Sequence, residues 1–189
     1  VLMVEFIDDD LDVARKKLKD LESLIKLDNQ NNDFAAYEDL NDQKAVFEIR
    51  KAGLNILMSM KGDRKGVAFI EDCAVTLENL ADYTERLRDV FRKYNTEGLF
   101  YAHASVGTLH VRPILNAKSE QDIKNMKAIA KEAFTMVKEY KGSHSGEHGD
   151  GIVRSEFHEM MFGKKIVDAF EEIKDTFDPK GLLNPGKIV

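Results

Sequence analysis

The sequence has 189 residues, of which 43% are hydrophobic and 33% charged, enough for a domain with a substantial core. Aspartate and glutamate (34) outnumber lysine and arginine (28), and the net charge of -6 argues against nucleic acid as a partner. The single cysteine, Cys73, excludes an intramolecular disulfide and a cysteine-rich metal site within the chain. It indicates a reducing compartment, so we expect a cytoplasmic protein, with peripheral attachment to a membrane as the alternative.

Apolar spacing predicts strands and helices along the whole chain. Leu2 to Ile7 is a short apolar run that indicates a buried strand, and apolar residues every three or four positions from Leu11 indicate a helix that breaks at 29–33. The elements expected next are a helix over 37–49, a strand over 67–75, a helix over 77–94, a strand–turn–strand over 99–115 centred on Gly107, a helix from the cap Ser119 to Tyr140, and a helix over 162–177.

This order predicts an α+β fold: a ferredoxin-like antiparallel sheet with helices packed on one face, plus a C-terminal helix and arm. Residues 142–151 hold four glycines and form a loop, and Asp178-Pro179 ends the last helix before the turn-rich arm 180–189. We expect residues 1–189 to form one domain. The abrupt start in an apolar run, without an initiator methionine, suggests a piece of a longer protein.

All five histidines lie between positions 103 and 158, and this clustering is the most informative feature of the sequence. If the chain turns at 105–108, His103 and His110 become neighbours across two strands, close enough to share a metal ion. Glu147, in the glycine-rich loop, would add a carboxylate. Two histidines and a carboxylate form the set of catalytic zinc sites that keep a position open for substrate.

Each of these residues also has an ordinary structural interpretation. Histidines beside a hairpin are often merely polar or core residues, and Asp150 between two glycines suits a turn. His158 is expected at the surface or an interface, His144 is ambiguous, and Cys73 suits a small strand residue rather than a nucleophile. Two other functions therefore stay open: a stand-alone metal-dependent hydrolase, and a non-catalytic ferredoxin-like interaction module.

Three strings together resemble the signatures of one family. HASVGTLHVRPILN at 103–116, GSHSGEHGDGIVRSEF at 142–157 and FDPKGLLNPGKIV at 177–189 are similar to the motifs of the C-terminal domain of FAD-linked oxidases. This is the family of flavin-dependent D-lactate, glycolate and D-2-hydroxyglutarate dehydrogenases. The departures at 104–108 and the Gly149-Asp150-Gly151 run resemble the subgroup in which the flavin protein is fused to an iron–sulfur module.

The resemblance implies a set of site residues for the oxidation of a D-2-hydroxy acid. It implies that His148 is the base that takes the hydroxyl proton, and that His103, His110 and Glu147 hold a divalent metal, zinc or manganese in type. A guanidinium suits the substrate carboxylate. The candidates for this contact are Arg50, Arg112 and Arg154.

The resemblance also implies partners that these 189 residues do not supply. FAD would be held mainly by an N-terminal domain, because no Gly-x-Gly-x-x-Gly loop occurs in the chain, with Asn184 and Lys187 of the arm approaching the flavin ring. A 4Fe-4S cluster in a fused module would accept the electrons. An exposed domain surface could also support a homo-oligomer.

Overall fold

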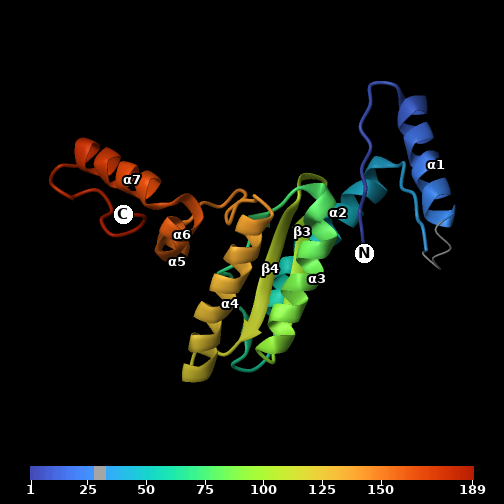
Figure 1. The fold of residues 1–189 in the computed structure, drawn as a ribbon. Helices are drawn as coiled ribbons and strands as arrows, with labels where there is room; N and C mark the ends of the chain where they lie inside the picture. The colour runs from blue at the N-terminus through green and yellow to red at the C-terminus, as the bar shows by residue number, and fades with distance from the viewer. Residues whose placement is uncertain (28–32) are drawn as a thin grey trace. The chain divides into compact units, whose positions relative to one another are not determined.

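The computed structural model describes residues 1–27 and 33–189, which separate into two compact units, Val1–Leu54 and Asn55–Val189 (Figure 1). The first unit holds α1 (Leu11–Leu27) and most of α2 (Leu40–Met58). The expected break of the first helix at 29–33 lies largely outside the described residues. No described helix is both long enough and apolar enough to cross a bilayer.

Two expectations for the first unit are wrong. Residues 2–7 do not form a strand, and Leu2 and Ile7 are more than 80% exposed, because no described residue pairs with this segment in a ladder. The second helix does not end near 49 but continues to Met58. Gly53 lies inside it, since one glycine in a helix costs only about 1 kcal/mol.

The second unit is built on an antiparallel sheet around β4 (Thr108–Leu115). β3 (Gly98–His103) pairs along one edge of β4, and β1 (Lys65–Gly66) and β2 (Cys73–Ala74) pair with the two ends of its other edge. An isolated bridge joins Ala74 to Ser143. The strand order is therefore Ser143, β2, β4, β3, which confirms the ferredoxin-like α+β arrangement.

The long strand expected over 67–75 is wrong, since only β2, at 73–74, lies within it. β1 precedes the segment, and residues 69–72 between the two strands form bends and a turn. Asp72 has a left-handed backbone, with φ at 61°, which a regular strand does not permit. Phe69, Ile70, Cys73 and Val75 of this segment are nevertheless buried. The apolar pattern therefore predicted the burial of these residues correctly but not their backbone conformation.

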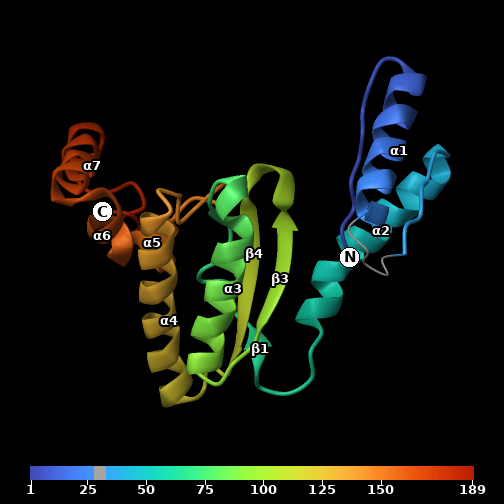
Figure 2. The ribbon, with the colours of Figure 1, turned by 45° about the vertical axis from the view of Figure 1, so that its right-hand side comes forward.

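The sheet has two chemically different faces because side chains alternate along β4. Leu109, Val111 and Leu115 join the apolar core with residues of α3 (Leu77–Lys93) and α4 (Glu120–Glu139), which lie side by side over the sheet (Figure 2). Thr108, His110 and Arg112 alternate with these core residues along β4, so their side chains lie on the opposite face of the sheet, away from α3 and α4. The expected cap is confirmed, since the Ser119 side chain accepts a hydrogen bond from the Asp122 N–H at the start of α4.

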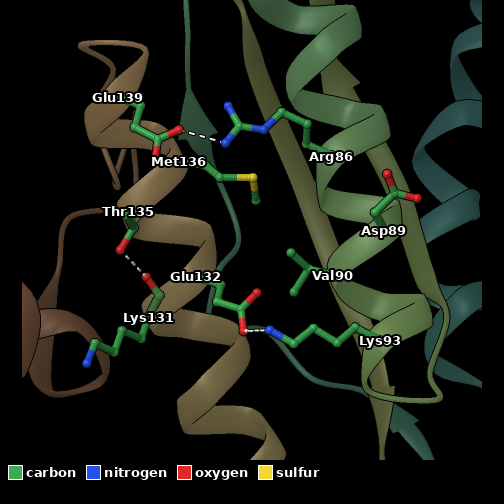
Figure 3. A pocket seen from close by; sticks show the side chains of 9 residues that line it. All are labelled: Arg86, Asp89, Val90, Lys93, Lys131, Glu132, Thr135, Met136 and Glu139. Carbon is green, nitrogen blue, oxygen red and sulfur yellow. Dashed lines mark hydrogen bonds and ion pairs between the residues drawn. The ribbon is translucent and has the colours of Figure 1, made fainter.

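Paired charges line the groove between α3 and α4 on the outer side of the helices (Figure 3). Arg86 contacts Glu139 at 2.6 Å, and Lys93 contacts Glu132 at 2.7 Å. These ion pairs join the two helices across the groove. The groove therefore belongs to the helix–helix packing, on the side of the sheet opposite His110.

The C-terminal region is a chain of short elements. α5 (Gly151–Arg154) and α6 (His158–Phe162) precede α7 (Lys164–Phe177), so the helix expected over 162–177 is confirmed except that Gly163, with φ at 82°, separates Phe162 from it. Asp178 then holds the arm, because its carboxylate accepts hydrogen bonds from Lys174 and from the N–H groups of 182 and 183. The Lys174 contact, followed by those two N–H groups, lowers the pKa of Asp178 to about 2.

The hairpin tip provides a test of this packing. Gly107 has φ at 72°, and a Cβ atom there would lie 1.8 Å from the backbone oxygen of Val75. We expect Gly107→Ala to lower the free energy of unfolding by at least about 2 kcal/mol in urea denaturation. Gly62→Ala is the matched control: it has a similar φ of 92° but open space around it, so only the backbone strain, about 1 kcal/mol, remains. Equal losses in the two variants would contradict the close approach.

Candidate functional site

The open face of the sheet brings His103 and His110 together. Their ring centroids lie 5.1 Å apart, as the hairpin predicted. The register differs in detail: His110 is opposite Tyr101 and His103 is opposite Thr108, so the two histidines are diagonal neighbours. Long side chains span that diagonal, which keeps both imidazoles within reach of one ion.

The glycine-rich loop adds Glu147 and His148 to this face. Glu147 Oε1 lies 3.0 Å from His110 Nε2, 3.7 Å from His103 Nε2 and 3.5 Å from His148 Nε2. The His148 ring stacks on His110 at 5.3 Å. Residues from two strands and one loop, far apart in sequence, therefore converge as two histidines and a carboxylate with a third histidine beside them.

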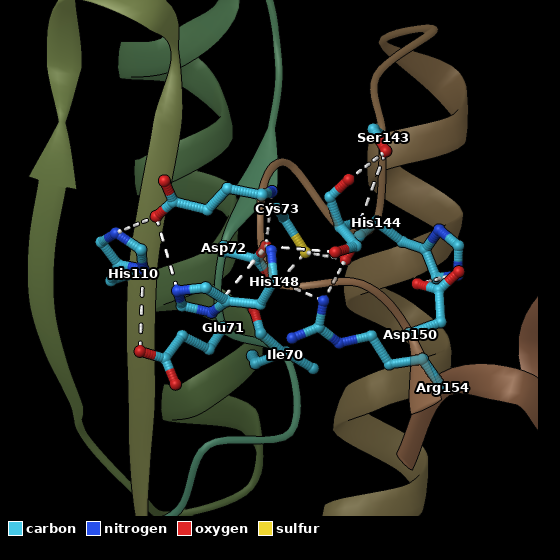
Figure 4. A network of polar contacts seen from close by, with 12 residues as sticks. Ile70, Glu71, Asp72, Cys73, His110, Ser143, His144, His148, Asp150 and Arg154 are labelled. Carbon is cyan, nitrogen blue, oxygen red and sulfur yellow. Dashed lines mark hydrogen bonds and ion pairs between the residues drawn. The ribbon is translucent and has the colours of Figure 1, made fainter. Parts of the chain in front are cut away.

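Asp72 holds the loop in this position (Figure 4). Its Oδ2 atom accepts hydrogen bonds from the N–H groups of Glu147 (2.9 Å) and His148 (2.8 Å) and from the Ser145 hydroxyl (3.1 Å). Its Oδ1 atom contacts Arg154 Nη1 at 2.5 Å. Asp72 is fully buried, so it fixes the backbone that presents Glu147 and His148 without reaching the open face.

The electrostatics of the site come from burial and from carboxylates. Burial lowers the pKa of His110 below its ordinary value, against the opposite pull of Glu147 and Glu71. Neutral imidazole is the form that binds metal. Burial would raise the pKa of Asp72, but the Glu147 and His148 N–H groups and Arg154 outweigh it and the pKa is lowered.

The structure separates the three candidate arginines. Arg112 lies on the same strand face as His110, and its Nη2 contacts both carboxylate oxygens of Glu71 at 2.9 and 3.1 Å. Arg154 is 5% exposed and is bound to Asp72 and to the His144 carbonyl, so it supports the loop, and its contact with substrate stays a prediction. Arg50 lies on α2 in the first unit, and its role stays a prediction.

A second cluster lies beyond Asp72 and Arg154. His144, Asp150 and His158 bring a carboxylate and two imidazoles together, and the two histidines are 1% and 2% exposed. His158 was expected at the surface or an interface and is instead buried at the start of α6, with its ring against Phe162 and against Phe170 of α7. Burial lowers the pKa of His144, against the pull of Asp150.

Comparison with known proteins identifies the family. The model of the family "FAD linked oxidases, C-terminal domain" matches residues 1–188. The chain belongs to this family. It is 34% identical over 166 residues to a D-2-hydroxyglutarate dehydrogenase of Haemophilus influenzae, covering 86% of the chain but 16% of that protein. It is 31% identical over 148 residues to a D-lactate dehydrogenase of Archaeoglobus fulgidus (78% and 31%), and 28% identical over 144 residues to glycolate oxidase subunit GlcD of Bacillus subtilis (76% and 30%).

The chain thus spans less than a third of the length of each of these relatives. The arm residues Asn184 and Lys187 follow α7, and none of the cluster contacts described above involves them. Their approach to a flavin stays a prediction. Cys73 is fully buried in β2, and burial raises the pKa of its thiol to about 12, which fits a structural residue rather than a nucleophile.

Sequence reasoning missed two residues of this site in the FAD-linked oxidase domain. Glu71 and Asp72 stood inside an expected strand and had no assigned role. Their signal was present as two adjacent acidic residues in an otherwise apolar, buried run, because buried carboxylates require partners. Those partners lie more than 40 residues further along the chain, so only the fold identifies them.

Asp72→Asn tests the support of the loop. The substitution keeps the shape but removes the charge opposite buried Arg154, and we expect a loss of about 3–5 kcal/mol in the free energy of unfolding in urea. Asp63→Asn is the matched control, because Asp63 pairs with Lys118 at 2.6 Å on the surface and its loss should cost less than about 1 kcal/mol. A change of similar size in both variants would contradict the role of Asp72.

The same residue predicts a dependence on pH. Because folding lowers the pKa of Asp72, its stabilisation is complete above the ordinary value of 3.8 and is lost as pH falls through the lowered value in the folded protein. The difference in unfolding free energy between wild type and Asp72→Asn should therefore be constant at neutral pH and shrink below about pH 4. A difference that grew with acidification would show the opposite shift.

Proposed function

We propose that this chain is the substrate domain of an FAD-dependent dehydrogenase that oxidises a D-2-hydroxy acid of the D-lactate, D-2-hydroxyglutarate or glycolate type. The observation that carries the proposal is the convergence of His103, His110, Glu147 and His148 on the open face of the sheet. Membership of the FAD-linked oxidase family and the names of the relatives support the reaction class. FAD would supply the acceptor for the hydride that leaves C2.

The first part of the proposed site is a divalent metal, zinc or manganese, on His103, His110 and Glu147. The donor set fits, because the Nε2 atoms of His110 and His103 face one Glu147 carboxylate oxygen at 3.0 and 3.7 Å, and imidazole nitrogen with carboxylate oxygen is a donor set of zinc-class sites. A metal there would lower the pKa of the substrate hydroxyl and orient it. Glu147 is 44% exposed on its side chain, which leaves that edge of the set accessible.

The second part is the base. The His148 side chain is 48% exposed and stacked on His110, so its imidazole can reach a hydroxyl placed beside the ligand set. A neutral imidazole can accept the proton as hydride leaves. Asp72 accepts a hydrogen bond from the His148 backbone N–H and thereby positions the residue.

The third part is recognition of the substrate carboxylate. Arg112 lies two residues from His110 on the same strand face. Its Nη2 donates to Glu71, and its Nη1 donates one hydrogen bond to Met58 Sδ at 3.0 Å. A guanidinium carries five N–H donors, so further donors stay available. We therefore favour Arg112 over Arg154 for this contact and retain Arg50 as a second candidate.

Other parts of the proposal concern the assembly around this chain. We propose that an FAD-binding domain completes the site, that Asn184 and Lys187 contact the flavin, and that an iron–sulfur module accepts the electrons. The chain covers only 16% of the D-2-hydroxyglutarate dehydrogenase it resembles, a length that accommodates further domains in such a protein. Cytoplasmic location, with or without peripheral membrane attachment, and homo-oligomerisation are retained as proposals. Iron and acid-labile sulfide analysis of the purified protein tests the acceptor directly.

Anaerobic flavin reduction tests the function. The purified holoenzyme is mixed with D-lactate, D-2-hydroxyglutarate or glycolate, and bleaching of the flavin is followed with and without chelator. We expect one acid to bleach the flavin, chelator to slow the reaction, and His148→Ala to slow it by about 10²–10⁴-fold because the base is missing.

Matched variants separate the metal set from general effects. Glu147→Gln should slow bleaching and lower metal content, whereas Glu156→Gln, a surface carboxylate of similar exposure paired with Lys127, should change neither. Bleaching that ignores both chelator and His148→Ala would overturn the metal-and-base site. Hydrolysis of esters or amides without flavin would instead favour the hydrolase alternative, and no metal binding at all would favour the interaction module.

A further inference from the structure

The cluster of His144, Asp150 and His158 is separate from the proposed active site. His144 comes from the glycine-rich loop, Asp150 precedes α5 and His158 begins α6. Asp150 Oδ1 lies 3.2 Å from His144 Nε2, and Asp150 Oδ2 lies 2.8 Å from His158 Nε2. Figure 4 shows His144 and Asp150 on the far side of Asp72 from His110.

The cluster concentrates unsatisfied polar atoms. Six buried side-chain atoms of the described residues have no hydrogen-bond partner, and four of them belong here: both ring nitrogens of His144, Nδ1 of His158 and Oδ1 of Asp150. The surroundings are aromatic, with rings of Phe134, Phe162 and Phe170 within 6.0 Å of the imidazoles. Polar atoms buried without partners in such surroundings are costly.

No cation of the chain compensates the Asp150 carboxylate in the described structure. The neighbouring guanidinium, Arg154, is directed to Asp72 and to the His144 carbonyl. Asp150 therefore faces only the two imidazoles. A carboxylate and two imidazoles around a common point, with no internal countercharge, form a donor set for a divalent cation.

We propose that His144, Asp150 and His158 form a second metal site, which takes a divalent cation of the zinc class. One ligand atom from each residue lies within 4.8 Å of the others. The contacts of 3.2 and 2.8 Å compare with about 3.3 Å between neighbouring ligand atoms around tetrahedral zinc. An ion between these ligand atoms would give His144 Nε2 and Asp150 Oδ1 the partner they lack.

The role of this ion would be structural. The near-complete burial of both histidines leaves no room for substrate, whereas the ion would tie the loop of His144 to the start of α6. The same loop carries Glu147 and His148, and Asp72 holds it from the opposite side. The second site would thus fix the far side of the segment that the proposed active site uses.

Metal stoichiometry tests the proposal independently of flavin chemistry. The purified protein is stripped with chelator, reloaded with Zn²⁺, desalted and analysed for zinc. His110→Ala/Glu147→Gln removes two of the three proposed active-site ligands, and Asp150→Asn, which preserves shape, removes the central ligand of the second site. We expect two equivalents in wild type, one in each of these proteins and none when the changes are combined.

A second measurement guards against misfolding. In the His110→Ala/Glu147→Gln protein, Zn²⁺ should raise the melting temperature in circular dichroism, and Co²⁺ should produce a visible absorption band from nitrogen and oxygen ligands. Adding Asp150→Asn should abolish both effects while the far-ultraviolet spectrum stays unchanged. Zero equivalents in His110→Ala/Glu147→Gln, or wild-type stoichiometry in Asp150→Asn, would overturn the second site. If instead the proposed active-site metal does not exist, the His110→Ala/Glu147→Gln protein would bind as much zinc as the wild type. That result differs from either result that overturns the second site.

Discussion

The buried carboxylate of Asp72 is the constraint on which the candidate site depends. It accepts hydrogen bonds from the backbone N–H groups of Glu147 and His148 and neutralises Arg154 in the interior. A loop with four glycines has no fixed shape of its own, because glycine adopts many backbone conformations. Asp72 supplies the fixed point from a left-handed turn beside β2, and the side chains of the loop are thereby directed to the open face of the sheet.

The alternation along β4 explains how one strand serves both stability and chemistry. Its odd-numbered residues enter the core under α3 and α4, while His110 and Arg112 project from the other face. Because the opposite face of β4 is packed against the helices, the strand is rigid and holds its candidate ligands in place. By packing against the back of the sheet, α3 and α4 hold the strand that carries His110 and Arg112. The glycine-rich loop then adds Glu147 and His148 to the same site.

Local patterns predicted the parts of this structure that depend on neighbours in sequence. Ser119 indicated the start of α4, and the spacing of His103 and His110 around Gly107 indicated the hairpin. Errors arose where distant contacts decide the outcome. Residues 67–75 were apolar enough for a strand, but the left-handed turn at Asp72 interrupts it. Asp72 is 75 residues from Glu147 and 82 from Arg154, so no periodicity reveals its role.

An anomalous diffraction map at the zinc edge, from crystals of the purified protein reloaded with Zn²⁺, tests the central claim most directly. The account predicts a peak within bonding distance, about 2.0–2.2 Å, of a nitrogen on His103 and on His110 and of a Glu147 carboxylate oxygen. That peak would show that the hairpin and the Asp72-held loop together build a metal centre. A map with no peak among these three residues, in crystals that diffract well and contain zinc elsewhere, would contradict it.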